Sequence, residues 1–139
     1  MPKKKCKLRY ASRQTLLGEK TERTMEVSGT WDFDKKALRF KEKISDDDND
    51  LEVETTFLFL RDYIRVYRDG ELAFTFDEKK ITDTVYKTPY GPMKMSISTK
   101  RMGQEFSESR GTIYIEYEIY FDKDTKSDCA YGLQFEVDS

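Results

Sequence analysis

The sequence predicts an all-β protein, an up-and-down antiparallel barrel of about 8–10 strands. Residues 111–121 alternate between apolar and polar side chains, with Ile113, Ile115 and Ile119 on one parity. This is the period of a strand that buries one face. Similar short stretches recur along the chain, and none has the period and length of a long helix. A meander of short strands leaves two open edges, and closure into a barrel removes them.

The first half of the chain contains four predicted strands. Residues 12–22 are polar and are interpreted as a loop, and residues 45–50 as an acidic loop. Gly29 lies inside a strand pattern, which indicates either a bulge or the close approach of another backbone. The four predicted strands are residues 6–10, 25–31, 38–44 and 51–59.

The second half of the chain contains six more predicted strands. Asp69-Gly70 predicts a hairpin, for which we expect a three-residue loop, Arg68–Gly70, with a left-handed Gly70. That register pairs Val66 with Leu72 and keeps Arg65 on the outer face, where its guanidinium is solvated. Residues 100–110 are interpreted as a loop. The six strands are residues 64–66, 72–76, 81–86, 93–99, 111–121 and 129–137. Short turns between consecutive strands favour a barrel over a two-sheet sandwich.

A conspicuous turn precedes the strand at 93–99. Its residues are Thr88, Pro89, Tyr90 and Gly91. Proline fixes φ and donates no hydrogen bond, so a tight, solvent-facing turn with Pro89 at its second position is expected. Its predicted role is architectural, because it sets the register of the following strand.

The residues around this turn also resemble those of a known protein family. With Tyr86 before it, Thr99 after it and the run Gly111-x-Ile113-x-Ile115-x-Tyr117, the chain resembles the YwiB-like bacterial family of unknown function. The further matching pieces are Ser28-Gly29, Phe40-x-Glu42 and Ile64-x-Val66-x-Arg68-x-Gly70. The resemblance covers nearly the whole chain and implies a lipocalin-like (calycin) barrel in a bacterial cytoplasm. It implies no activity and no site residues.

Length and composition narrow the class of protein. A chain of 139 residues is expected to form a single domain, residues 1–139. The net charge of −2 argues against a nucleic-acid binder. No apolar run is long enough to span a membrane, and the N-terminal residues lack the apolar region of a signal peptide. A cytoplasmic location is therefore predicted, with Cys6 and Cys129 reduced.

The chemistry available to the chain is restricted. The sequence contains no histidine, which excludes Ser-His and Cys-His nucleophilic systems and histidine-based metal sites. Asp46, Asp48 and Asp50 alternate as calcium ligands do, but the pattern lacks the glycine of such loops and is interpreted as a solvated turn. We therefore predict no enzymatic activity, no metal and no cofactor.

One carboxylate falls on an inward parity. Glu42 shares the parity of Phe40 and Ile44. A buried carboxylate needs a partner and often marks a site. Because unpaired buried carboxylates are rare, we expect a bulge or a position at the wet mouth of the barrel instead.

Two functions compete. The first is a non-enzymatic binder of a small apolar or amphipathic ligand. The alternative is a filled barrel that acts through protein contacts, in a homodimer or with another protein, on an outer face bearing Tyr63, Tyr67, Tyr114 and Tyr120. The predicted ligand region contains inward-parity residues from distant strands: Trp31, Phe57, Met93, Met95 and Tyr117.

Overall fold

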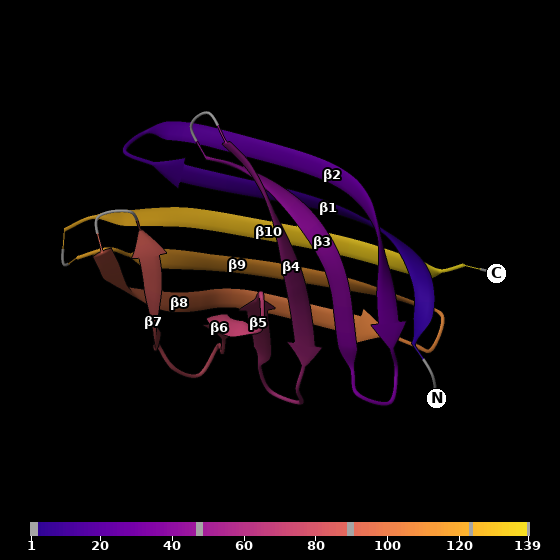
Figure 1. Cartoon of the computed structure of the whole chain (residues 1–139). Coiled ribbons are helices and arrows are strands. Elements are labelled where there is room, and N and C mark those ends of the chain that lie inside the picture. Colours follow the sequence, from indigo (N-terminus) through magenta and orange to yellow (C-terminus); the bar gives the residue numbers. More distant parts are fainter. Residues whose placement is uncertain (1–2, 47–48, 89–90, 123, 139) are drawn as a thin grey trace.

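Period-two alternation produces ten antiparallel strands in the computed structural model, and no helix in the part of the chain that it describes (Figure 1). The described residues are 3–46, 49–88, 91–122 and 124–138. The strands are β1 (Lys4–Leu16), β2 (Glu19–Asp32), β3 (Ala37–Asp46), β4 (Asn49–Phe59), β5 (Ile64–Arg68), β6 (Glu71–Phe76), β7 (Thr82–Thr88), β8 (Gly91–Phe106), β9 (Arg110–Tyr120) and β10 (Lys126–Val137).

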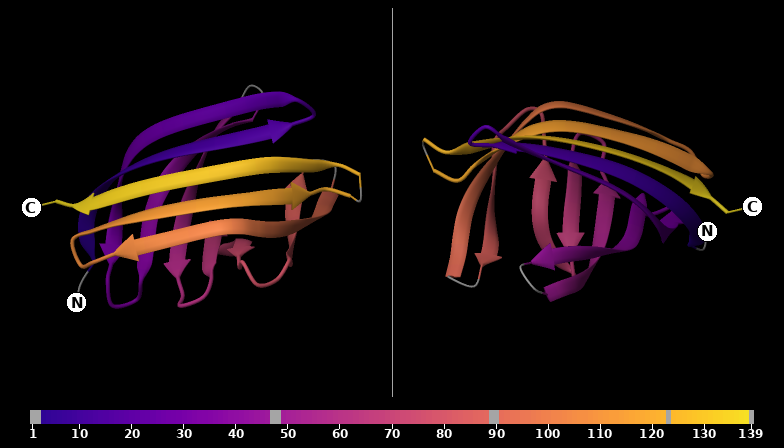
Figure 2. Two further views of the ribbon diagram at one scale, coloured as in Figure 1. Left: turned by 180° about the vertical axis from the view of Figure 1, so that it is seen from behind. Right: turned by 90° about the horizontal axis from the view of Figure 1, so that it is seen from above.

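The strands form one continuous sheet in the order β6-β5-β4-β3-β2-β1-β10-β9-β8-β7. The first and last strands pair, with Cys6 opposite Val137, so both chain termini lie at the same end (Figure 1). Strands β3 to β6 cross strands β8 to β10, and the sheet curls back on itself (Figure 2). The predicted up-and-down antiparallel barrel is confirmed. Within the described residues, no helix is long and apolar enough to cross a membrane.

The two edges of the sheet meet between β6 and β7. These strands follow each other in sequence but form no backbone ladder. Instead, the Thr82 hydroxyl donates to the Thr75 carbonyl at 2.6 Å, and the Thr84 hydroxyl donates to the Ala73 carbonyl. Two threonine side chains therefore connect the edges where a barrel would ordinarily use backbone hydrogen bonds.

We expect replacement of both threonines by valine, an isostere without the hydroxyl, to lower the free energy of unfolding by about 2 kcal/mol, roughly 1 kcal/mol for each lost hydrogen bond. Urea denaturation measures this. Thr24→Val, at an exposed position of β2, is the control and is expected to change stability by less than about 0.5 kcal/mol. A double variant as stable as the control would contradict the role of these two threonines in joining β6 to β7.

Two predicted loops are strands instead. Residues 12–22 form the ends of β1 and β2, joined through Leu17 and Gly18, both with positive φ. Residues 100–110 were likewise expected to be irregular, but β8 continues to Phe106 after a register shift at Thr99. The first segment escapes prediction because the hairpin is polar on both faces. In the second, the bulge changes the parity and hides the period of two.

The β5–β6 turn also differs from its prediction. Arg68 pairs with Glu71, so the loop has two residues rather than three. Its residues, Asp69 and Gly70, have φ of 49° and 82°. Two left-handed residues make the turn whose twist matches that of the flanking strands. The left-handed conformation of Gly70 is confirmed, and the loop length is wrong.

A bulge in β6 keeps the apolar side chains on one face despite the shorter loop. The register shifts after Val66, which pairs with Phe74 and not with Leu72. Leu72 consequently lies outside, 49% exposed, whereas Ile64 is fully buried. Arg65 alternates with these buried residues on β5 and lies on the outer side, as predicted.

Some predictions concern parts of the chain that are only partly described. Pro89 and Tyr90, in the predicted turn, lie outside the described residues. Thr88 and Gly91, on either side of them, pair as the adjoining ends of β7 and β8. Of the acidic stretch, Asp48 lies outside the described residues, and the side chains of Asp46 and Asp50 are not described.

Gly29 lies in a regular pair with Phe40, so it marks no bulge. A Cβ atom at this position would be 2.4 Å from the carbonyl oxygen of Arg39 and 3.2 Å from a methyl of Leu8. The close approach of another backbone is therefore the reason for this glycine.

On the outer face of β9, Glu118 forms the centre of a charged cluster. Its carboxylate is 2.9 Å from Lys100 Nζ, pairs with Lys126 and accepts a hydrogen bond from the Tyr120 hydroxyl. Hydrogen bonds from Lys126 and Lys100 lower the pKa of Glu118 to about 2, against an ordinary value of 4.5.

The folded-state pKa lies below the unfolded one, so ionised Glu118 stabilises the fold above about pH 4.5, and this contribution is lost as the pH falls towards 2. We expect Glu118→Gln to lower the melting temperature by roughly 3–6 °C at neutral pH. The difference from the wild type is expected to shrink steadily below about pH 4.5. Thermal melts between pH 7 and pH 3 test this, and a difference independent of pH would contradict the ionic origin.

Candidate functional site at the open end of the barrel

The inner face of the barrel changes character along its length. We call the end that carries the chain termini and the β2–β3 and β4–β5 turns the closed end (Figure 1). Its inward side chains are 0–3% exposed: Leu8, Trp31, Leu38, Phe59 and Phe135. Towards the opposite end, which we call the open end, Ile119 and Ser127 are buried, but several of the described inward side chains are half-buried: Arg23, Met25, Val53, Arg68, Phe74, Cys129 and Tyr131. Solvent therefore reaches part of the inner face at the open end.

Aromatic rings fill the closed end. The Trp31 ring lies 4.6 Å from that of Phe135, 5.6 Å from that of Phe106 and 5.8 Å from that of Phe59, measured between centroids. Its indole N–H donates to the Ser107 carbonyl at 3.1 Å. Such contacts are typical of a packed core.

A polar cluster lies next to this core, towards the open end. Glu42 is 5% exposed and accepts a hydrogen bond from the Thr55 hydroxyl at 2.7 Å. Arg68 Nη2 lies 4.0 Å from the same carboxylate, and the Arg68 side chain is 35% exposed. Glu42 therefore points inward and is buried, and the expectation that a bulge would turn it outward is wrong. Regular pairing of β3 with β4, which places Glu42 opposite Val53, preserves its inward parity.

Interior tyrosines surround the cluster. The Tyr10 ring lies 5.6 Å from that of Tyr131, and its hydroxyl donates to the sulfur of Met25. Burial raises the pKa of Tyr10, and Glu42 raises it further, while Arg23 and Arg68 partly offset this. Burial likewise raises the pKa of Tyr131. These phenols stay protonated and supply neutral hydroxyl groups beside Glu42 and Arg68.

Arg68 is the residue of this cluster that the sequence interpretation missed. The predicted three-residue loop placed it in the turn. The two-residue loop places it opposite Thr55 at the end of β5, on the same inward parity as Ile64 and Val66. The Asp69-Gly70 pair was the available signal, because such a pair favours a two-residue turn.

The comparisons with known proteins identify a family but no activity. The family model described as domain of unknown function DUF1934 matches residues 8–133. The chain belongs to this family. No protein of curated function matches the sequence.

The solved structures agree on the fold. The crystal structure of the ywiB protein from Bacillus subtilis has a TM-score of 0.83 at 19% identity, covering 99% of this chain and 94% of that one. At this identity the likeness concerns the fold alone. A protein of unknown function from Bacteroides ovatus is similar at a TM-score of 0.38 and 14% identity, over 97% of this chain and 41% of that one, too weakly to support an argument.

The five residues of the predicted ligand region occupy different places in the barrel. Trp31 belongs to the closed end. Phe57 lies midway, 5.6 Å from the ring of Tyr131. Tyr117 packs against Phe76, with ring centroids 4.7 Å apart. Met95 is buried on β8, and Met93, two residues nearer the open end, is 36% exposed. Their role in binding stays a prediction.

Two methionines on one face of β8 offer a test of the packing. We expect Met95→Trp to lower the free energy of unfolding by roughly 1–3 kcal/mol, because the larger ring overpacks a site that is 6% exposed. Met93→Trp is the matched variant and is expected to cost less than about 0.5 kcal/mol, since Met93 reaches solvent. Equal stabilities in urea denaturation would indicate free space around Met95.

The outer tyrosines do not form one group. Tyr63 directly precedes β5 and Tyr67 lies in it, whereas Tyr114 and Tyr120 lie on β9, well separated in the strand order. Three of them already have partners: Tyr63 lies against the Arg65 guanidinium, and the hydroxyls of Tyr114 and Tyr120 donate to Glu116 and Glu118.

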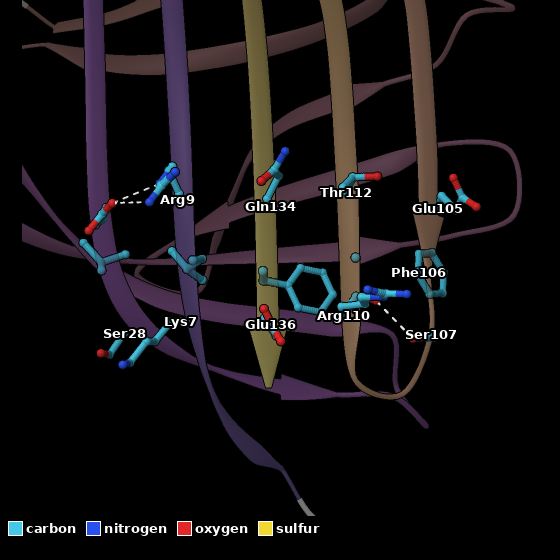
Figure 3. A pocket seen from close by; sticks show the side chains of 15 residues that line it. Lys7, Arg9, Ser28, Glu105, Phe106, Ser107, Arg110, Thr112, Gln134 and Glu136 are labelled. Atoms are coloured by element: carbon cyan, nitrogen blue, oxygen red, sulfur yellow. Dashed lines mark hydrogen bonds and ion pairs between the residues drawn. The ribbon is translucent and has the colours of Figure 1, made fainter. Parts of the chain in front are cut away.

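A broad hollow of about 1170 Å³ extends over β2, β1, β10, β9 and β8 (Figure 3). Its exposed charged side chains are mixed in sign: Lys7, Arg9 and Arg110 against Glu26, Glu105 and Glu136. Arg9 and Glu26 pair at 2.7 Å, each more than 60% exposed. A balanced, solvated surface of this kind selects no charge, so the hollow is a weaker candidate than the open end of the barrel.

The cysteines lie on neighbouring strands but far apart. Cys6 is opposite Val137, and Cys129 is opposite Gln14, so they are separated by the distance between positions 6 and 14 of β1, roughly 26 Å. A disulfide needs Cα atoms within about 7 Å, so this fold does not bring the two together. Burial raises the pKa of Cys6 to about 11. Their reduced state stays a prediction.

Proposed function

We propose that this protein is a non-enzymatic binder of a small amphipathic ligand, which it holds at the open end of the barrel. The observation that carries the proposal is the ion pair Glu42–Arg68 on the inner face, in which the arginine side chain is 35% exposed. A purely structural core gains little stability from a buried ion pair, since apolar side chains at such positions are often equally or more stabilising. Charged groups kept on an inner face are typical of a site.

The surroundings of the pair suit an amphipathic molecule. Phe74, Met25 and Val53 are half-buried on the same inner face and offer apolar surface to a short chain or ring. Small-molecule sites commonly combine a mostly apolar lining with a few polar groups that fix the orientation. The flexible thioether of Met25 can adapt to the shape of the ligand.

Titration of the isotopically labelled protein with 1-decanol and with decanoate, followed by amide chemical shifts, tests the proposal. We expect saturable binding of one molecule, with the largest shifts at Arg68, Phe74 and Tyr131. Shifts concentrated at outer residues such as Lys7 and Gln134, or no binding of either compound up to its solubility limit, would overturn it.

Protein contact is the second candidate function, and exposed apolar side chains near the two edges of the sheet, β6 and β7, favour it. Leu72, Ile81 and Val85 are 49%, 62% and 54% exposed, on or beside β6 and β7. Apolar exposure at an edge is typical of a contact surface. Sedimentation over a range of concentrations tests this, and an association weakened by Leu72→Ser would support it.

A further inference from the structure

The Arg68 guanidinium has unused hydrogen-bonding capacity. Its Nε is buried and has no hydrogen-bond partner among the described residues. Its Nη2 lies 4.0 Å from Glu42, too far for a hydrogen bond. The Glu42 oxygen nearest to it already accepts the Thr55 hydroxyl. A guanidinium carries five N–H donors, so Arg68 can donate to a further acceptor.

The group is nevertheless held in place. Its central carbon lies 5.5 Å from the centroid of the Phe74 ring, a distance at which cation and ring attract each other. Pairing of Arg68 with Thr55 and with Glu71 fixes the backbone on both sides. An oriented guanidinium with free donors is suited to a planar anion, which it can bind through two parallel hydrogen bonds.

Two arginines of the open end act on the same phenol. Arg23 and Arg68 both act electrostatically on the Tyr10 hydroxyl, in the direction opposite to Glu42. Arg23 lies on β2 opposite Ser12, two residues from Met25 on the same parity. A ligand with a negative charge would complement the guanidinium of Arg68.

We infer that the ligand is an amphipathic carboxylate whose head group binds Arg68 and whose apolar chain lies along Phe74 towards Met25. This inference rests on the proposed function and specifies its ligand. Glu42 acts as a positioning residue, because it holds Thr55 and keeps the guanidinium turned towards the interior.

Calorimetric titration of the full chain with decanoate, 1-decanol and decylamine tests the inference. For the wild type we expect decanoate to bind at least about tenfold more tightly than 1-decanol, and decylamine to bind more weakly than either. Arg68→Gln is expected to weaken decanoate binding by about tenfold to a hundredfold and to leave 1-decanol binding unchanged. Arg65→Gln, on the outer side of the same strand, is the matched control and is expected to change neither.

A second measurement needs no variant. Raising the salt concentration is expected to weaken the binding of decanoate and not that of 1-decanol. Equal affinity for decanoate and 1-decanol, or equal effects of Arg68→Gln and Arg65→Gln, would overturn the carboxylate inference and leave the proposed function standing. Failure of all three compounds to bind would overturn both.

Discussion

Replacing Gly29 with alanine is expected to lower the free energy of unfolding by about 3 kcal/mol, at the upper end of the usual cost of overpacking. The added methyl would lie 2.4 Å from the Arg39 carbonyl oxygen and 3.0 Å from Cβ of Phe40. Neither neighbour is the mobile end of a side chain. The paired strands β2 and β3 must therefore separate to admit it.

A matched variant isolates the steric cause. Gly132→Ala is also a strand substitution, but a Cβ at position 132 meets nothing within 4 Å. We expect it to be neutral or to stabilise by up to about 1 kcal/mol, because alanine loses less backbone entropy on folding. Urea denaturation of the two variants measures the difference, and similar stabilities would refute the close approach at Gly29.

Trp31→Ala is expected to have the largest effect, a loss of about 4 kcal/mol, within the range measured for buried aromatic residues. Trp31 is 1% exposed and contacts the rings of Phe33, Phe59, Phe106 and Phe135. Its removal leaves a cavity that these rings cannot all close, and leaves the Ser107 carbonyl without its donor.

Thermal denaturation measures the loss, and Tyr114→Ala is the control. Tyr114 is 40% exposed on the outer face of β9, so we expect its truncation to cost less than about 1 kcal/mol. A Trp31→Ala variant as stable as Tyr114→Ala would show that the closed end is not a packed core.

The fold was predictable because most strands bury one face. Ile113, Ile115 and Ile119 fall on one parity and are all buried in β9. This regularity fails at bulges. After the register shift at Thr99, inward positions on β8 change from odd to even, and Met102 and Phe106 pack against the core. A pattern of period two cannot extend through such a shift, so the second half of β8 was interpreted as a loop.

The candidate site was only half predictable, for the same reason. Glu42 lies on a regular strand, and its parity alone indicates that it faces inward. The position of Arg68 depends on the length of the β5–β6 loop and on a compensating bulge beyond Val66. Two register choices have to be right before Arg68 and Glu42 fall on the same face. The energetic gain of the two-residue turn decides the loop length, and burial of Phe74 and Phe76 decides where the bulge lies.

Membership of the family does not decide the function. Barrels of this kind can hold a ligand or be filled by their own side chains, and the choice depends on the site rather than on the fold. In this chain the closed end is filled, and the open end keeps a guanidinium with free donors beside a buried carboxylate.

Native mass spectrometry of the protein purified under mild conditions from the cells that produce it tests the ligand-binding proposal most directly. We expect a 16.5 kDa chain carrying one small acidic molecule, which is absent from the Arg68→Gln variant and retained by Arg65→Gln. A bare chain in all three preparations, or an adduct that Arg68→Gln retains in full, would contradict it.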